Sequence, residues 1–405
     1  MTTMSAYLTV ARFFAVALFI LTLSSAGWSQ TEKIIYTFTV ADGGTPEGGV
    51  TADSQGNLYG TTSTGGALGC CGTVIELSPG SGTWTEKVIY DFSLGGGADG
   101  FLPYSGLVFD TKGNLYGTTL SGGANFQGTV FELSPGSSGI WTEKVLYSFT
   151  GGTDGGSLFD SSLIVDSSGN LFGNSDGGGT YGYGAIFEIV AGSNGTWTEK
   201  VVHSFKGGND GMYPYASPLV MDAEGELYGA TPVGGAHDFG VVYQLTPQSN
   251  GTWSEKIIYA PTGVDGLNGP FGGLVLDTAG NLYSAFTFGI FELMPEKNGN
   301  WTEKTLYRFV GSPDGAYPEG VISDKVGNPY GTTNSGGVHR GTVFELSPGS
   351  NGSWSERVLH RFQPDGIDGI FPQFGTVAVD SSGNVYGTTP QGGGSSQGVV
   401  FEVTP

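Results

Sequence analysis

Residues 106–149 read GLVFDTKGNLYGTTLSGGANFQGTVFELSPGSSGIWTEKVLYSF, and this stretch decides the fold. Four short segments rich in Val, Leu, Tyr and Phe are separated by Gly, Pro, Asn, Asp and Ser, which is the pattern of short strands joined by turns. No segment has apolar residues at the spacing of an amphipathic helix over a stretch long enough to form one. The expected strands are Gly106–Asp110, Asn114–Thr119, Gly128–Leu133 and Glu143–Phe149.

The same unit occurs seven times along the chain. Its Gly-Asn-Leu-Tyr-Gly segment, or a close variant, recurs every 55 to 57 residues, with one shorter interval of 47. Repeats of this length are typical of solenoids, propellers and arrays, and four antiparallel strands make one propeller blade. The sequence therefore predicts an all-β fold, a seven-bladed β-propeller of four-stranded antiparallel blades. The segments begin at Gly56, Gly113, Gly169, Gly225, Gly280, Gly327 and Gly383.

The two ends of the repeated region complement each other. It begins with a fourth-strand segment, Glu32–Phe38, and ends with a third-strand segment, Gly398–Val403. We expect the N-terminal strand to become the outer strand of the last blade and to close the ring, which would remove exposed sheet edges. The fifth unit is short between Tyr283 and Phe291. We interpret this as a clipped loop between its second and third strands, so that seven blades remain.

Residues 1–26 have the layout of a secretory signal peptide. Arg12 is their one charge, Phe13–Leu23 is apolar apart from Thr22, and small residues follow. The apolar run is too short to span a bilayer comfortably, although an uncleaved anchor is the alternative. We expect residues 27–405 to form one exported domain, extracellular or periplasmic. Because Pro405 directly follows a strand, we also expect release rather than surface anchoring.

The charge balance restricts the partners. Asp and Glu number 37 against 15 Lys and Arg, giving a net charge of −22. This argues against nucleic acid, whose phosphates require basic patches, and against anionic membranes after signal cleavage. It fits a monomer that stays dispersed by self-repulsion. The two cysteines, Cys70 and Cys71, are adjacent, so a bridge between them is strained. The alternatives are a vicinal disulfide and two free loop thiols, and we favour the thiols.

The repeated pattern GNLYGTT…GG…GTVFELSP…WTEKVLYSF resembles the GloVer repeat, named for Gloeobacter and Verrucomicrobia, over Thr31–Pro405. The resemblance implies tandem repeats in exported bacterial proteins. It implies no activity and no catalytic residues, so none is transferred to this chain. The layout is also broadly similar to secreted propellers of the lyase and lactonase types, but their catalytic histidine and metal-ligand sets are not found in this sequence.

The titratable residues fit structural roles. His203 and His360 fill a strand position that is tyrosine in the other five units, and His237 and His339 lie in loops of blades that are not adjacent. We therefore predict no metal site and no cofactor. One ring of aspartates should cap the first hairpin of each blade: Asp53, Asp110, Asp166, Asp222, Asp277, Asp324 and Asp380. A second ring should shape the connections between blades, with Ca²⁺ as an alternative role: Asp42, Asp99, Asp154, Asp210, Asp265, Asp314 and Asp368.

The repeat symmetry breaks where each connection should reach the channel mouth. The residue after the proline position is aromatic in four consecutive units and Glu or Gln in the other three. Aromatic faces stack on sugar rings and shield cations, so we predict a binding site there. Packing of these rings between blades is the structural alternative. The predicted binding residues are Glu47, Tyr104, Phe159, Tyr215, Phe271, Glu319 and Gln373.

Three functions remain open from the sequence. The first is a secreted, non-catalytic propeller that binds a polysaccharide or a protein at the mouth. The second is a secreted lyase or glycosidase that uses Glu47 and Glu319, since glycosidases work with paired carboxyl groups. The third is a purely structural extracellular protein.

Overall fold

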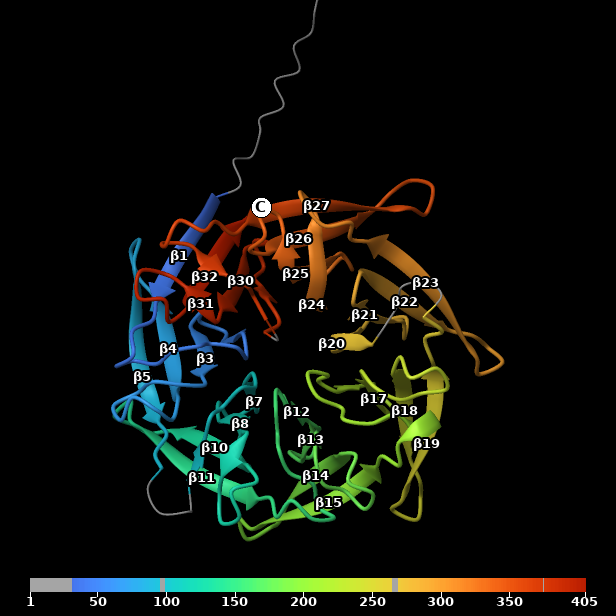
Figure 1. Cartoon of the computed structure of the whole chain (residues 1–405). Coiled ribbons are helices and arrows are strands. Elements are labelled where there is room, and N and C mark those ends of the chain that lie inside the picture. Colours follow the sequence, from blue (N-terminus) through green and yellow to red (C-terminus); the bar gives the residue numbers. More distant parts are fainter. Residues whose placement is uncertain (1–30, 95–98, 264–268, 374) are drawn as a thin grey trace, which may run out of the picture.

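Seven four-stranded antiparallel sheets surround a central axis, as Figure 1 shows. The computed structural model describes residues 31–94, 99–263, 269–373 and 375–405. The predicted seven-bladed propeller is confirmed, whereas the predicted signal peptide, residues 1–26, lies outside the described residues.

The strands follow the expected units. From the innermost strand outward, the first blade consists of β2 (Val50–Ala52), β3 (Leu58–Thr62), β4 (Thr73–Pro79) and β5 (Trp84–Asp91), the second of β7 (Val108–Phe109), β8 (Leu115–Thr119), β10 (Thr129–Pro135) and β11 (Trp141–Ser148), and the third of β12 (Ile164–Val165), β13 (Leu171–Ser175), β14 (Ala185–Ala191) and β15 (Trp197–Ser204). The fourth consists of β16 (Val220–Met221), β17 (Leu227–Thr231), β18 (Val241–Pro247) and β19 (Trp253–Tyr259), and the fifth of β20 (Pro270–Leu276), β21 (Leu282–Phe286), β22 (Gly289–Pro295) and β23 (Trp301–Arg308). The sixth consists of β24 (Gly315–Ser323), β25 (Pro329–Gly336), β26 (Thr342–Pro348) and β27 (Trp354–Arg361), and the seventh of β29 (Ala378–Val379), β30 (Val385–Thr389), β32 (Val399–Thr404) and β1 (Thr31–Thr37).

Burial changes from the inside of each blade to its outside. The second strand is buried along its whole length, as in β8, because neighbouring blades cover both of its faces. The outer strand is more exposed, as in β11, whose first four residues alternate between half-buried and exposed, because one of its faces meets solvent. The core consists of clusters between adjacent blades. One of them joins Tyr116 and Val130 of the second blade to Leu171 and Phe187 of the third.

The first and last strands close the ring. β1 pairs antiparallel with β32 from Thr31↔Thr404 to Thr37↔Val399, and it lies beside β32 at the rim in Figure 1. The predicted closure by the N-terminal strand is thus confirmed. Phe38, just after β1, is fully buried in the cluster between the last and first blades.

The fifth blade keeps four strands despite its short loop. β21 and β22 are joined directly after the Phe286↔Gly289 pair, so the clipped-loop interpretation is confirmed. The aromatic packing of this blade also differs. Phe286 stacks on Phe291 with ring centroids 3.9 Å apart, whereas Phe92 of the first blade meets Phe131 of the second edge-on at 5.2 Å.

The first ring of aspartates caps the inner hairpins as predicted. Asp110 Oδ1 accepts hydrogen bonds from the backbone N–H groups of Lys112 (2.8 Å) and Asn114 (2.9 Å), and its Oδ2 accepts one from Asn114 Nδ2 (2.9 Å). These bonds satisfy turn donors that would otherwise need water. They also hold the pKa of Asp110 below its ordinary value, although burial acts the other way.

Candidate functional site

The loop between the second and third strands carries a Gly-Gly pair in six of the seven units, and we call these the Gly-Gly loops. They and the connections between blades lie on one face, which we call the mouth face. Short pairs link a connection to the loop of its own blade: β6 (Gly100–Phe101) with β9 (Ser121–Gly122), and β28 (Gly369–Ile370) with β31 (Gln391–Gly392). Links to the preceding blade are repeated as well, for example the 2.9 Å hydrogen bond from Leu102 N to Cys71 O. Loops and connections therefore share a face, and both elements are anchored by backbone bonds.

Among the aromatic residues predicted for the mouth, Tyr104 and Phe159 are in contact. Tyr104 of the second blade and Phe159 of the third have ring centroids 4.9 Å apart with their planes tilted by 41°. Both side chains are half-buried, as is that of Tyr215. Burial raises the pKa of Tyr104, with a further contribution from the Glu47 carboxylate, and burial beside Asp176 raises the pKa of Tyr215. Aromatic and acidic groups therefore share this part of the mouth face.

The other predicted residues occupy equivalent places in their blades. Glu47, Glu319 and Gln373 are half-buried, and each follows a buried proline. Glu47 and Gln373 lie a few residues before the inner strands β2 and β29, and Glu319 lies within the inner strand β24. The backbone of Phe271, in β20, pairs with that of Ala285, in β21, but the side chain of Phe271 lies outside the described part of the structure. Whether these residues contact a ligand stays a prediction.

The structure adds a buried carboxyl that the sequence reasoning missed. Asp160 is only 2% exposed, and its backbone has a left-handed φ of 48°. Its carboxyl interacts electrostatically with Glu47, Asp176 and Glu319. These residues belong to the first, third and sixth blades, and side chains from such distant blades can meet only near the axis. We call Glu47, Asp160, Asp176 and Glu319 the axial carboxyls.

Burial controls the protonation of the axial carboxyls. It raises the pKa of Glu47 to about 7 and that of Asp176 to about 8, the latter partly offset by the backbone N–H of Phe159. It raises the pKa of Asp160 well above the ordinary value, with further contributions from the neighbouring carboxylates. Buried oxygens of three of these groups, Glu47 Oε2, Asp160 Oδ2 and Asp176 Oδ1, have no hydrogen-bond partner among the described residues. Such groups favour a proton or an external donor.

A small signal for Asp160 was present in the sequence. Between the proline position and the aspartate that ends the first strand, the third unit has one residue more than the second, and Asp160 lies in this extra length. The fourth and seventh units share the longer spacing, and Ala216 of the fourth also has a positive φ, 49°. A register comparison of the units would have found the position. It would not have shown that the side chain lies at the axis.

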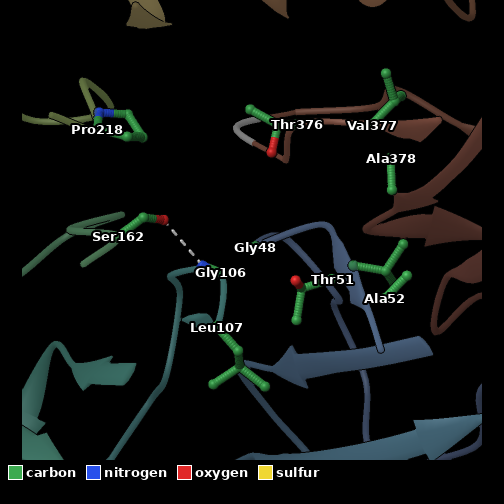
Figure 2. A pocket seen from close by; sticks show the side chains of 11 residues that line it. Gly48, Thr51, Ala52, Gly106, Leu107, Ser162, Pro218, Thr376, Val377 and Ala378 are labelled. Carbon is green, nitrogen blue, oxygen red and sulfur yellow. Dashed lines mark hydrogen bonds between the residues drawn. The ribbon is translucent and has the colours of Figure 1, made fainter. Parts of the chain in front are cut away.

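A pocket next to the inner strands differs from the axial carboxyls in having an uncharged lining. Its cavity of about 310 Å³ is lined by Gly48, Leu107, Ser162, Pro218 and Thr376, among others, and none of the described residues that line it is charged. Figure 2 shows these residues around the pocket, with the 3.1 Å hydrogen bond from Gly106 N to Ser162 Oγ joining the second and third blades. The axial carboxyls thus lie outside this pocket, toward the mouth face.

Exposed aromatic residues also lie on the loops and connections of the mouth face. Phe126 and Tyr181, on Gly-Gly loops, are 63% and 52% exposed. Tyr213 packs edge-on against Tyr183, and Tyr317 packs against Phe288 with centroids 5.4 Å apart. These residues give the mouth face apolar surface at its rim.

The histidines and the second ring of aspartates can now be compared with their predicted roles. His203 and His360 lie in β15 and β27 and pack edge-on against Phe205 and Phe362, so their place in an aromatic position is confirmed. His237 and His339 are exposed. The aspartates of the second ring act as turn acceptors where they are described, and Asp265 lies outside the described residues. Asp42, for example, accepts from Thr39 N at 2.7 Å and Tyr36 OH at 2.5 Å.

The adjacent cysteines form a disulfide. Cys70 and Cys71 are bonded to each other in the Gly-Gly loop of the first blade. The favoured interpretation as two free thiols was wrong. Cys71 is buried in a core cluster that includes Phe92, and Cys70 and Phe101 pack against this cluster.

Comparisons with known proteins agree with the repeat and the fold. The sequence profile of the Gloeobacter/Verrucomicrobia repeat matches residues 13–196, 142–290 and 288–405. None of the curated proteins is significantly similar in sequence. Among solved structures, a catalytically inactive form of virginiamycin B lyase from Staphylococcus aureus, with quinupristin, is 14% identical with a TM-score of 0.57. The match covers 93% of this chain and 99% of that one.

A second solved structure is an extracellular domain of a putative one-component system from B. thetaiotaomicron. It is 13% identical with a TM-score of 0.57, and the match covers 93% of this chain but only 42% of that one. At these identities the likeness shows the propeller fold alone. Within the part of the chain that the structure describes, no helix is long and apolar enough to cross a membrane.

Proposed function

Since the chain belongs to the Gloeobacter/Verrucomicrobia repeat family, we propose that it is an exported, non-catalytic binding protein that recognises a saccharide at the mouth face. The observation that carries the proposal is the set of axial carboxyls beside Tyr104 and Tyr215. Three of the four carboxyls have a buried oxygen without a partner among the described residues. A ligand rich in hydroxyl groups would supply those partners.

The chemistry of the mouth suits such a ligand better than a strongly charged one. With the pKa values of Glu47 and Asp176 raised to about 7 and about 8, these carboxyls both accept and donate hydrogen bonds near neutral pH. Sugar hydroxyls do the same. The tilted rings of Tyr104 and Phe159 offer apolar surface against which a sugar ring can pack. An anionic polysaccharide is disfavoured by the net charge of −22.

Binding of the purified protein to a panel of polysaccharides and cell-wall fragments, with and without Ca²⁺, tests this function. We expect saturable binding to at least one glycan and at least about tenfold weaker binding in the double variant Tyr104→Ala/Tyr215→Ala, because stacked aromatics carry much of such affinity. The matched control is Phe126→Ala/Tyr181→Ala, which removes two aromatic rings from the rim of the same face.

The two variants separate the outcomes. If the axial double variant binds normally, the axial site is not the binding site, and loss in the rim variant alone would move the site to the loops. If no glycan binds, a protein partner at the mouth face becomes the better explanation. A Ca²⁺ requirement would support the alternative role of the second aspartate ring.

Catalysis is the second candidate, favoured by one observation. The raised pKa values of Glu47 and Asp176 lie where a general acid works near neutral pH. A lyase or glycosidase would lose turnover in Glu47→Gln while keeping its substrate affinity. Unchanged turnover in Glu47→Gln and in Asp176→Asn would exclude these two acids as catalytic groups.

A further inference from the structure

The junctions between blades repeat a three-residue contact far from the axial carboxyls. An aromatic residue of the outer strand of one blade meets the second-ring aspartate of the following connection and a glutamate on the outer strand of the next blade. Tyr36, Asp42 and Glu86 form this contact between the last and first blades. In the tyrosine junctions the phenol donates directly to the aspartate, at 3.0 Å from Tyr147 to Asp154 and 3.1 Å from Tyr307 to Asp314.

Histidine replaces the tyrosine at the junction between the third and fourth blades. His203 of β15 there meets Asp210, in the short helix η1 (Gly208–Asp210), and Glu255 of β19. One ligand atom from each side chain lies within 4.8 Å of the other two. At this junction a gap separates the imidazole from the aspartate, where the tyrosine junctions have a hydrogen bond.

The distances in this gap are those of metal ligands rather than of hydrogen-bond partners. His203 Nε2 lies 3.4 Å from Asp210 Oδ2 and 3.6 Å from Glu255 Oε1. N–H···O hydrogen bonds are usually about 2.7–3.2 Å long. Ligands about 2.0–2.2 Å from a tetrahedral zinc ion are separated from one another by roughly 3.4 Å. Within the described residues, His203 Nε2 is buried without a hydrogen-bond partner, and a cation there would satisfy it. Glu255 Oε1 is also buried without a partner, but so is the equivalent oxygen at tyrosine junctions, for example Glu86 Oε1, so the imidazole nitrogen is what distinguishes this junction.

The surroundings fix the ligands in place. The backbone N–H of Lys206 donates to Asp210 Oδ2 at 2.6 Å, which holds that carboxylate toward the histidine. The imidazole ring packs edge-on against Phe205, with centroids 4.8 Å apart. The three ligand side chains are mostly buried, with 13% of the side-chain surface exposed for His203 and Asp210 and 15% for Glu255. The ligands therefore converge without a large rearrangement of the blades.

We propose that His203, Asp210 and Glu255 bind a divalent transition-metal ion, for which Zn²⁺ is the probe, and that the ion clamps the third blade to the fourth. One imidazole and two carboxylates bring a charge of −2 that the ion neutralises. An imidazole ligand favours zinc and its neighbours over Ca²⁺ and Mg²⁺, which prefer oxygen ligands alone. The protein supplies three ligands, which leaves a position for water.

The junction between the sixth and seventh blades provides an internal comparison. It has the same residue types, Glu32 of β1, His360 of β27 and Asp368. There, however, His360 Nε2 lies 2.9 Å from Asp368 Oδ2, which is an ordinary hydrogen bond that a metal would have to break. At the junction between the third and fourth blades the ion would replace the hydrogen bond that the Asp210 and Glu255 side chains share, but His203 has no hydrogen bond to lose. That junction is therefore the better suited of the two to a metal ion.

Zinc titration of the EDTA-treated full-length protein by calorimetry, with metal content measured after dialysis, tests the proposal. We expect one tight zinc equivalent in the wild type and at least about 100-fold weaker binding in His203→Tyr. This substitution is mild for the fold because tyrosine occupies the same position at Tyr36, Tyr90, Tyr147, Tyr259 and Tyr307. His237→Ala, which removes an exposed loop histidine, is the matched control and should bind zinc as the wild type does.

A thermal shift separates a built site from loose surface binding. Zinc should raise the Tm of the wild type and of His360→Tyr, but not that of His203→Tyr, because an ion that binds the folded protein tightly and the unfolded chain weakly stabilises the fold. Glu255→Gln serves as the second ligand variant should His203→Tyr fold poorly, and it too should lose the tight site. Absence of saturable zinc binding, or tight binding that survives both His203→Tyr and Glu255→Gln, would overturn the proposal.

Discussion

Ile34 of β1 and Phe401 of β32 are cross-strand partners, although they lie near opposite ends of the chain. The last blade therefore exists only when the chain returns to its beginning. In the other six blades all four strands are consecutive in sequence apart from the short β9 of the second blade's loop. Closure of the ring thus depends on one long-range pairing, and on the buried Phe38 that follows it.

Phe38→Ala should destabilise the whole protein, not only the terminal strand. Phe38 is fully buried, and truncation of such a phenylalanine costs about 3–5 kcal/mol. Phe149 takes the equivalent position after the outer strand of the second blade, is equally buried, and is the matched comparison. We expect both alanine variants to lower the free energy of unfolding by similar amounts in urea titrations. A much smaller loss for Phe38→Ala, below about 1 kcal/mol, would mean that closure contributes little.

The stability of the protein should fall as the pH rises from about 4 to about 8. Burial raises the pKa of Asp176 from 3.8 to about 8 and that of Glu47 from 4.5 to about 7. In this range the folded state holds protons that the unfolded state releases, so folding is favoured at the acidic end. Outer-strand glutamates such as Glu143, whose pKa is about 7, act in the same direction.

Thermal unfolding between pH 5 and pH 8 measures this dependence. Asp176→Asn should reduce the fall in Tm across that range, because the amide carries no charge at either end. Glu296→Gln is the control, since Glu296 is fully exposed and its pKa is shifted downward. A Tm that rises toward pH 8, or a slope unchanged by Asp176→Asn, would contradict the assignment of buried, protonated carboxyls.

Gly117→Ser should be costly because the second strand has no room for a side chain there. A Cβ on Gly117 would lie 2.6 Å from the ring of Phe131 and 2.9 Å from Leu107. Overpacking of this kind costs about 1–3 kcal/mol. Gly394→Ser, on an exposed loop with nothing within 4 Å of the added atom among the described residues, should be nearly neutral. Denaturant unfolding of the two variants checks this, and equal stabilities would show that the strand relaxes.

Reduction of the Cys70–Cys71 disulfide should change stability only slightly. The bridge joins neighbouring residues and encloses no intervening chain. A disulfide that closes so short a loop restricts the unfolded state little, by about 1 kcal/mol. We expect the Tm of the reduced protein to stay within a few degrees of the oxidised value, with mass spectrometry confirming the redox state. Loss of cooperative unfolding on reduction would show that the bridge organises the first blade.

Contacts between residues close in sequence were predictable from the repeat. Asp110, Asn114 and Tyr116 form the hairpin cap that their spacing predicts, because those contacts are local. The Gly-Gly loops and connections share a face because strand alternation within a blade leaves them no other place. The fifth blade was harder to predict. Pro261 takes the position of the buried phenylalanine found in other units, and Phe286 fills that space from the next blade.

The amino-acid sequence by itself determined the number of blades, their strand order and the strand that closes the ring. Each of these follows from a period and a turn chemistry that act within about one repeat. Only the tertiary structure decided which side chains meet across repeats. The axial carboxyls come from the first, third and sixth blades, and His203 meets Glu255 across a blade junction. Such meetings depend on the curvature of the closed ring, which sums small rotations over all seven blades and leaves no trace in local sequence.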